Sequence, residues 1–322
     1  MRALILVLLA LATPARADFP QTVQDHILPG YAAFDVATRA LADKASETCL
    51  PDELAPAYHA AYDAWMAVQH LRFGPVETDG RALAILYWPD PKALGAKAQM
   101  ALLTGDPAKL TPEAFAEQSV AARGLLSLER LLFPAETLPA DPCPLIRATT
   151  ADLARIAAQV HADWQDGFAQ TLATAGDAGN ATYLTRPEAR QALFTQLATG
   201  LEFLHDSRLG RPLGSFGTPH PDRAEARASG RSQQNVLLGL QAMRQMVETL
   251  TPDAPETLAA FDRAIGLAKT LDDPVFAGVA VPRDRLKVEI LQQAVAQIRE
   301  VILSELAPEM DVGIGFNAAD GD

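Results

Sequence analysis

The sequence is poor in the residues and motifs on which several common kinds of protein depend. Its 322 residues include only two cysteines, and aromatic residues make up 6% of the chain. Runs of β-branched residues and two-residue hairpin turns are scarce, which argues against a β-sandwich or a β-barrel. The GxGxxG and Walker patterns, the GxSxG elbow, the CxxC pair and the HExxH zinc helix are all absent. These absences exclude the enzyme classes that need those motifs.

Basic residues are also in deficit. The chain has 27 Lys and Arg against 40 Asp and Glu, for a formal net charge of −13. An acidic surface repels phosphate groups, so neither nucleic acid nor anionic membrane is expected as a general partner. The longest early apolar run, residues 3–12, is shorter than the roughly 20 residues that span a bilayer, so we expect no membrane insertion.

The first residues have the pattern of an export signal. Arg2 gives the positive start, residues 3–12 the apolar centre and residues 15–17 an Ala-Arg-Ala cleavage site. We expect a signal peptide at residues 1–17, cleaved after Ala17, which leaves 305 residues with a net charge of −15 because Arg2 and Arg16 are lost. No cysteine lies near the new N-terminus, so we expect a periplasmic protein without a lipid anchor.

The chain has two cysteines, Cys49 and Cys143, and their expected state follows from the expected export. In an exported protein two cysteines favour one disulfide, and two free buried thiols are the alternative. Cys49 follows one expected helix and Cys143 precedes another, so in an up-down bundle both could lie at the same end.

Helix-forming residues are abundant, with apolar positions at three- and four-residue spacing. Helices are expected at residues 22–48, 52–69, 93–103, 111–133, 144–168, 187–204, 232–250, 256–271 and 283–306. Residues 176–180 have the composition of a linker. We therefore predict an all-α fold of two domains, each resembling a four-helix bundle, at residues 18–178 and 179–322. An Arg-rich crossover loop is expected at residues 206–231 of the second domain.

One candidate metal pair stands near the end of an expected helix. Glu202 and His205 are three residues apart, so they share a helix face and could ligate one metal ion. Di-iron sites in helical bundles need a second Glu-x-x-His pair, which this sequence lacks. The alternative is an ordinary solvated helix end.

Glu129 interrupts an otherwise apolar helix. A carboxylate on the inner face of a bundle must be paired, hydrogen-bonded or metal-bound, because burying it alone is costly. Glu129 is therefore either part of a site or the partner of a nearby arginine, with Arg123 and Arg130 as the local choices.

Arginines gather in the expected crossover loop of this acidic chain. Within 24 residues lie Arg208, Arg211, Arg223, Arg227 and Arg231. Guanidinium groups bind carboxylates through two parallel hydrogen bonds. The cluster therefore fits either an anionic ligand or glutamates of the first bundle.

Several of these segments together resemble the imelysin-like family of exported bacterial proteins, which is linked to iron uptake. The resemblance spans nearly the whole mature chain. Its motifs are Trp65 with Gln69, FGP at 73–75, WPD at 88–90, Gly124 with Glu129, RPLG at 211–214, Arg227 with SGRS at 229–232, and GFNAADGD at 315–322. The last of these is the most specific.

The resemblance implies two helical bundles with a site near their interface. The family's GxHxxE motif was once interpreted as that of a metallopeptidase. Here Gly124 and Glu129 match the motif, but Leu126 stands at the histidine position. A leucine can neither ligate a metal nor transfer a proton, so the sequence favours a role without catalysis.

We therefore expect a non-catalytic periplasmic protein that assists iron acquisition. It would bind iron or another divalent metal, or an anionic iron-carrying ligand, between its two domains. The expected ligand-binding residues are Gly124, Glu129, Arg227, Ser229 and Arg231, and the expected metal ligands are Glu129, Glu202 and His205. Two alternatives stay open: a metallopeptidase of the imelysin type, and a scaffold that binds another envelope protein.

Overall fold

The computed structural model describes residues 19–251 and 253–312, and these ranges contain helices but no β-strand. The all-α prediction is confirmed. The expected signal peptide, residues 1–17, and the segment 313–322 lie outside the described residues. The α-helices are α1 (Phe19–Thr22), α2 (Leu28–Glu47), α3 (Pro51–Val68), α4 (Arg81–Ile85), α5 (Leu94–Leu103), α6 (Pro112–Ala116), α7 (Gly124–Leu132), α8 (Cys143–Asp163), α9 (Ala169–Ala173), α10 (Arg186–Glu202), α11 (Gly210–Leu213), α12 (Ser232–Leu250), α13 (Pro255–Thr270), α14 (Pro282–Val301) and α15 (Ala307–Glu309).

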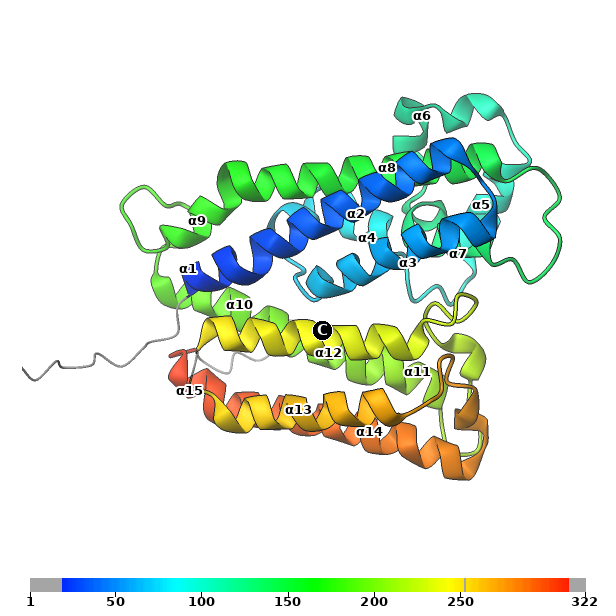
Figure 1. The fold of residues 1–322 in the computed structure, drawn as a ribbon. Helices are drawn as coiled ribbons and strands as arrows, with labels where there is room; N and C mark the ends of the chain where they lie inside the picture. The colour runs from blue at the N-terminus through cyan, green and yellow to red at the C-terminus, as the bar shows by residue number, and fades with distance from the viewer. Residues whose placement is uncertain (1–18, 252, 313–322) are drawn as a thin grey trace, which may run out of the picture.

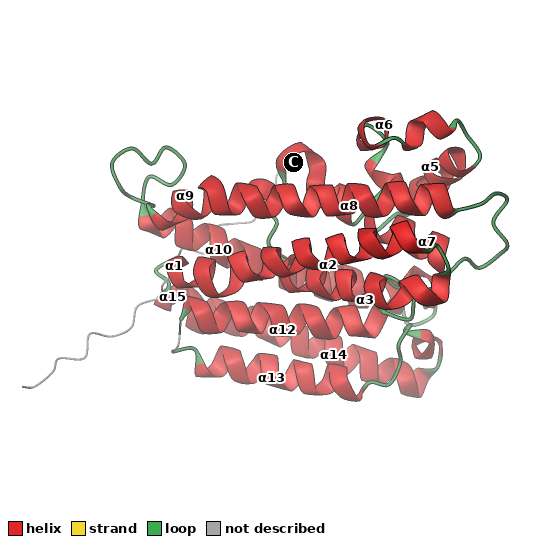
Figure 2. Ribbon diagram, turned by 45° about the horizontal axis from the view of Figure 1, so that its top comes forward, coloured by secondary structure: helices red, strands yellow, loops and turns green. Residues whose placement is uncertain are grey.

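Helices from the two halves of the chain form two groups, which lie one above the other in Figure 1. In the upper group, α2 packs against α3 and α8. In the lower group, α13 packs against α12 and α14. Helix α12 also packs against α3, and Figure 2, seen from 45° away, shows it in the same place between the groups. The contact between α3 and α12 therefore joins the two halves.

Buried apolar side chains form one continuous core that runs through both groups. Trp65 of α3 is fully buried, and its ring centroid lies 5.3 Å from that of Phe34 of α2. Phe261 of α13 is fully buried in the lower group. Burial of each such ring contributes about 1.5–3 kcal/mol to folding. Because the core is continuous, a division into two domains at residue 178 stays a prediction. No described helix is both long and apolar enough to cross a bilayer.

One expected helix, residues 111–133, is broken in two. Helix α6 ends at Ala116 and α7 starts at Gly124, with a short 3₁₀ turn between them. Gly124 has a φ of +72°, a conformation that ordinary L-residues rarely adopt. Apolar residues recur at helical spacing on both sides of Gly124. The sequence pattern therefore predicted one continuous helix where the backbone forms two.

The Arg-rich segment, residues 206–231, is less of a loop than expected. Helix α10 runs into a π-helical stretch, Phe203–Leu209, and then into α11 without leaving helical geometry. Leu204, Leu209 and Leu213 are buried along this path. Their burial against the core keeps the chain helical where glycine and proline suggested a loop.

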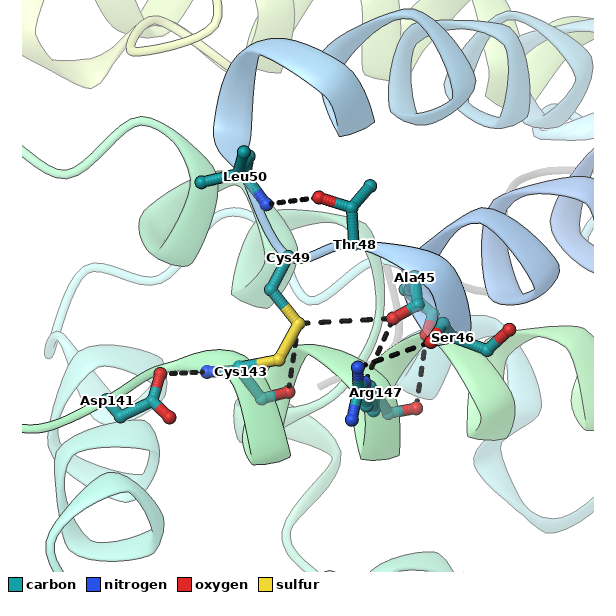
Figure 3. Close-up of a disulfide and its surroundings, with 9 residues drawn as sticks. Ala45, Ser46, Thr48, Cys49, Leu50, Asp141, Cys143 and Arg147 are labelled. Carbon is teal, nitrogen blue, oxygen red and sulfur yellow. Dashed lines mark hydrogen bonds between the residues drawn. A yellow bond between two sulfur atoms is a disulfide. The ribbon is translucent and has the colours of Figure 1, made fainter.

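A disulfide joins Cys49, just after α2, to Cys143 at the start of α8, as the sequence predicted (Figure 3). The two Cα atoms are 5.4 Å apart. Beside the bond, the Arg147 guanidinium of α8 donates from Nε to the carbonyl of Ala45, 3.0 Å away, near the end of α2. The covalent bond and this hydrogen bond fasten the same ends of α2 and α8.

Removal of the disulfide should lower stability because the cysteines are 94 residues apart. Closing so long a loop in the unfolded chain is worth about 4–5 kcal/mol in the chain-entropy model. We expect the double variant Cys49→Ser/Cys143→Ser to lose about 2–5 kcal/mol in the free energy of unfolding, measured with urea. A reductant should weaken the wild type by a similar amount and leave the double variant unchanged. A wild type that is equally stable in reductant would contradict this.

Candidate functional site

Glu129 of α7 and Ser229 are brought together although 100 residues separate them. The backbone N–H of Ser229 donates to Glu129 Oε1 at 2.8 Å, and its hydroxyl donates to the same oxygen at 2.7 Å. The Glu129 side chain is buried, with 6% of the residue exposed. The expectation of a buried, partnered carboxylate is therefore confirmed, and the partner comes from the other half of the chain.

Gly124 sets the position of α7, the helix that carries Glu129. A Cβ atom at Gly124 would lie 2.2 Å from the carbonyl oxygens of both Ala84 and Ile85, the last residues of α4. Only glycine permits this approach of two backbones. Gly124 therefore acts through packing: it lets α7 begin directly against the end of α4.

The segment that carries Ser229 is held by a buried ion pair. Arg208 Nε donates to Glu225 Oε2 at 2.6 Å, and both side chains are at most 3% exposed. Arg208 also donates to Gln69 Oε1 at the end of α3, and Asn235 of α12 donates to Glu225 Oε2, each at 2.9 Å. The network ties the Ser229 segment to α3, α12 and the π-helical stretch after α10.

Arg231 fastens the same segment to α3. Its guanidinium donates to Asp63, and a second nitrogen lies 3.0 Å from His59 Nδ1. The group also sits 4.7 Å from the ring centre of Tyr62, at cation–π distance. Arg231 was expected to bind ligand, but in the structure it forms an internal ion pair.

The arginines that were the alternative partners of Glu129 are engaged elsewhere. Arg123 pairs with Asp152, with nitrogen–oxygen distances of 2.8 and 3.0 Å. Arg130 donates from Nε to Gln99 Oε1 at 2.9 Å. Neither forms an ion pair with Glu129, so the simple local pairing is wrong.

Burial controls the ionisation of Glu129. Desolvation raises its pKa above the ordinary value of 4.5, and the nearby Glu225 carboxylate acts in the same direction. The two hydrogen bonds from Ser229 and the charge of Arg130 oppose that rise. Burial and the charge of Glu129 also raise the pKa of the Tyr58 phenol well above its ordinary value, so that phenol stays neutral.

A cavity of about 570 Å³ opens beside α7. It lies between α5, α7 and the stretch from α11 to residue 224, so both halves of the chain contribute to its wall. Leu126, at the position where the resembled family has histidine, lines it. The other lining residues are Trp88, Asp90, Pro91, Ala93, Ala96, Arg130, Arg211, Asp222, Arg223 and Ala224.

Three guanidinium groups, from Arg130, Arg211 and Arg223, line this cavity, and none forms an ion pair with a described residue. The Nε atom of Arg211 is buried and has no hydrogen-bond partner among the described residues. Of the two acidic residues in the wall, Asp90 accepts hydrogen bonds from the backbone N–H groups of Leu94 and Gly95 at 2.8 and 2.7 Å. Asp222 is the second acidic residue of the wall, so three guanidinium groups stand against two carboxylates and the wall keeps a small positive excess.

Two of the expected metal ligands, Glu202 and His205, contact other residues. Glu202 forms a long ion pair of 3.8 Å with Arg299 of α14, and His205 Nδ1 lies 2.5 Å from Asp206 Oδ1. Within residues 19–251 and 253–312, no three His, Cys, Asp or Glu side chains form a group that could hold a metal ion. Glu129, Glu202 and His205 therefore form no three-residue metal group in this arrangement, and metal binding by Glu202 with His205 alone stays a prediction.

The structure places the members of the arginine cluster in different surroundings. Arg227 was expected in the site, but its side chain is exposed and forms no ion pair with the described residues. Arg211 and Arg223 belong to the same cluster and line the cavity, together with Trp88. The only sequence signal for this cavity was the WPD motif at 88–90, because the sequence does not show which arginines of the cluster line it.

The buried carboxyl of Glu129 should make stability depend on pH. Its folded pKa is raised, so its favourable contribution is complete below the unfolded value near 4.5 and is lost as pH rises through the folded pKa. Glu129→Gln keeps an oxygen that can accept from Ser229 but does not titrate. We expect the free energy of unfolding of this variant minus that of wild type to increase with pH across this window and then level off.

Urea unfolding between about pH 4 and pH 8 measures this difference. The matched control is Glu300→Gln, at an exposed position of α14, for which the difference should stay flat. A flat difference for Glu129→Gln as well would show that its pKa is not raised on folding.

A family model and two solved structures resemble this chain. A family model described as Imelysin matches residues 27–302. An imelysin-like protein from Psychrobacter arcticum has a similar crystal structure, with a TM-score of 0.77 and 20% sequence identity, covering 94% of this chain and all of that one. A protein described as an iron-regulated protein A precursor from Parabacteroides distasonis has a TM-score of 0.66 and 13% identity, covering 91% of this chain and 96% of that one. No curated protein matches the chain significantly. The match of the family model over most of the sequence shows that the chain belongs to the imelysin family.

Proposed function

We propose that this protein is a non-catalytic, periplasmic member of the imelysin family that binds an anionic, iron-carrying ligand. The binding site is the cavity beside α7, and the iron arrives as cargo inside the ligand. The observation that carries the proposal is the set of three guanidinium groups on one cavity wall, those of Arg130, Arg211 and Arg223, without carboxylate partners.

Local charge supports an anion. The chain has a net charge of −13, yet this wall carries three arginines against two aspartates, Asp90 and Asp222. Guanidinium groups bind carboxylates and phosphates through paired, charge-assisted hydrogen bonds. A polycarboxylate chelate of ferric iron presents several such groups at once. The cavity volume of about 570 Å³ lies within the range of small-molecule sites.

Glu129 and Ser229 take a positioning role in this proposal. Their two hydrogen bonds join α7, which carries Arg130, to the segment that carries Arg223. Gly124 fixes the start of α7, and Arg231 anchors the segment to α3. These residues fix the relative positions of the cavity walls, and Arg130, Arg211 and Arg223 contact the ligand.

The nature of residue 126 favours binding over peptidase chemistry. Leu126 lines the cavity where the family motif has histidine. Its side chain offers neither a lone pair for a metal nor a proton for a leaving group. The link to iron draws on the structural neighbour that is described as an iron-regulated protein A precursor.

Ferric citrate is a suitable probe because it is an anionic, hydrophilic iron chelate. We expect wild-type protein to bind it and Arg211→Gln and Arg223→Gln each to weaken binding by about tenfold or more, since a hydrogen bond to a charged group is worth about 1.5–3 kcal/mol. Binding should also weaken as salt is added. Isothermal titration calorimetry at low ionic strength measures these affinities.

The matched control is Arg227→Gln, which removes the same charge from the same segment at an exposed position outside the cavity. Its affinity should stay near that of wild type. Absence of binding, or an equal loss in Arg227→Gln and Arg211→Gln, would overturn the proposal.

A further inference from the structure

A second cavity, of about 540 Å³, adjoins the first one at Trp88. It lies between the stretch from Gln69 to Trp88 and the α10 region, so it also lies between the two halves of the chain. Its apolar wall is formed by Leu83, Leu86, Trp88 and Phe203, and Thr199 of α10 also lines it. This volume is sufficient for a two-ring aromatic group.

Most polar groups around this second cavity are already engaged within the protein. Gln69 Oε1 accepts from Arg208 at 2.9 Å, and Gln196 Oε1 accepts from the backbone N–H of Arg72 at 2.8 Å. The Thr199 hydroxyl donates to the carbonyl of Thr195 at 2.8 Å. The surface that these bonds leave available is largely aromatic and aliphatic.

The histidine in this wall carries no charge near neutral pH. His70 is 4% exposed, and its Nε2 atom lies 3.3 Å from Nε2 of the buried His26. Burial and the neighbouring His26 hold the pKa of His70 well below its ordinary value. The Nδ1 atom of His70 is buried without a hydrogen-bond partner among the described residues. The charged residues that line this cavity, Arg72 and Glu77, form an ion pair with each other at 2.6 Å. The surface left for a ligand is therefore suited to an uncharged group.

Trp88 lines both cavities. Its ring meets Phe203 of the apolar cavity edge to face, with centroids 5.8 Å apart and planes at 87°. The guanidinium of Arg211, from the cationic cavity, lies 5.9 Å from the same ring centre. An apolar surface and a cationic surface thus meet at one indole ring.

We propose that the two cavities form one bipartite site for an amphipathic anion. The aromatic body of the ligand packs against Trp88 and Phe203, and its acid group binds Arg211 and the neighbouring guanidiniums. This inference rests on the anion site proposed above and defines the ligand class further: an organic acid with a flat apolar part, in preference to a wholly hydrophilic one.

Three iron-free probes test this inference: 2-naphthoate, which is aromatic and anionic, naphthalene-2-methanol, which is aromatic and neutral, and citrate, which is hydrophilic and anionic. Calorimetry gives the affinities. Fluorescence reports on the site, because Trp65 and Trp164 are fully buried in the core while Trp88 is partly exposed and lines the cavities. We expect 2-naphthoate to bind at least about tenfold more tightly than either other probe and to change the Trp88 emission.

Different variants test the cationic cavity and the apolar cavity. Arg211→Gln should weaken both anions by about tenfold or more. Thr199→Phe, which fills the apolar cavity, should weaken 2-naphthoate by a similar factor and leave citrate unchanged. Leu83→Ser provides a milder version at a residue that is 43% exposed, so its folding is not in doubt. Its matched control is Leu286→Ser, at an exposed position of α14 outside both cavities.

The outcomes distinguish this inference from the proposed function. If 2-naphthoate binds no better than citrate, or if Thr199→Phe and Leu83→Ser leave its affinity unchanged, the bipartite site is overturned while Arg211-dependent binding of ferric citrate would still support the function. If variants of both cavities weaken 2-naphthoate binding but ferric citrate does not bind, the bipartite site is supported and the proposal of an iron-carrying ligand is overturned. If no probe binds, both are overturned.

Discussion

The arrangement of the candidate site depends on one buried ion pair, Arg208 with Glu225. Both side chains are almost completely buried, so each charge is tolerable only because the other is present. Gln69, just after α3, and Asn235 of α12 both form hydrogen bonds to this pair, and α3 and α12 pack against each other between the two halves of the chain. Loss of one member of such a pair costs about 3–5 kcal/mol. Ser229 lies four residues beyond Glu225, so the same pair sets the position of the Glu129 contact and of one cavity wall.

The helices could be predicted because their apolar residues recur at helical spacing. The disulfide could be predicted because the two cysteines flanked expected helices in a chain with the pattern of an export signal. The same spacing misled us at residues 111–133, where it continues through Arg123 and Gly124. The break depends on the contact of Gly124 with the carbonyls of α4, which lies about 40 residues earlier in sequence. A contact between distant segments decides the backbone there, and no local pattern encodes it.

The site was predicted in part for a related reason. The burial of Glu129 followed from its apolar neighbours, but its partner, Ser229, lies 100 residues away. The five arginines of the crossover segment are chemically alike, and only the fold divides them. Arg208 and Arg231 form ion pairs with carboxylates, Arg211 and Arg223 line the cavity beside Trp88, and Arg227 is exposed. Sequence thus identified the cluster, and tertiary packing assigned the individual roles.

Helix α7 shows how the change at one position alters the chemistry of the whole site. Leu126 and Arg130 are four residues apart, so they share a helix face, and both line the same cavity. Glu129 does not line that cavity, and its Oε1 accepts two hydrogen bonds from Ser229. With leucine in place of the motif's histidine, the cavity face of α7 offers an apolar side chain and a guanidinium. Those two side chains fit the proposed anion site, because a guanidinium attracts an acid group and leucine has no polar atom that could transfer a proton. The residue that departs from the family motif thus lies in the wall of the proposed anion site, where it leaves Arg130 as the polar group that α7 presents to the cavity.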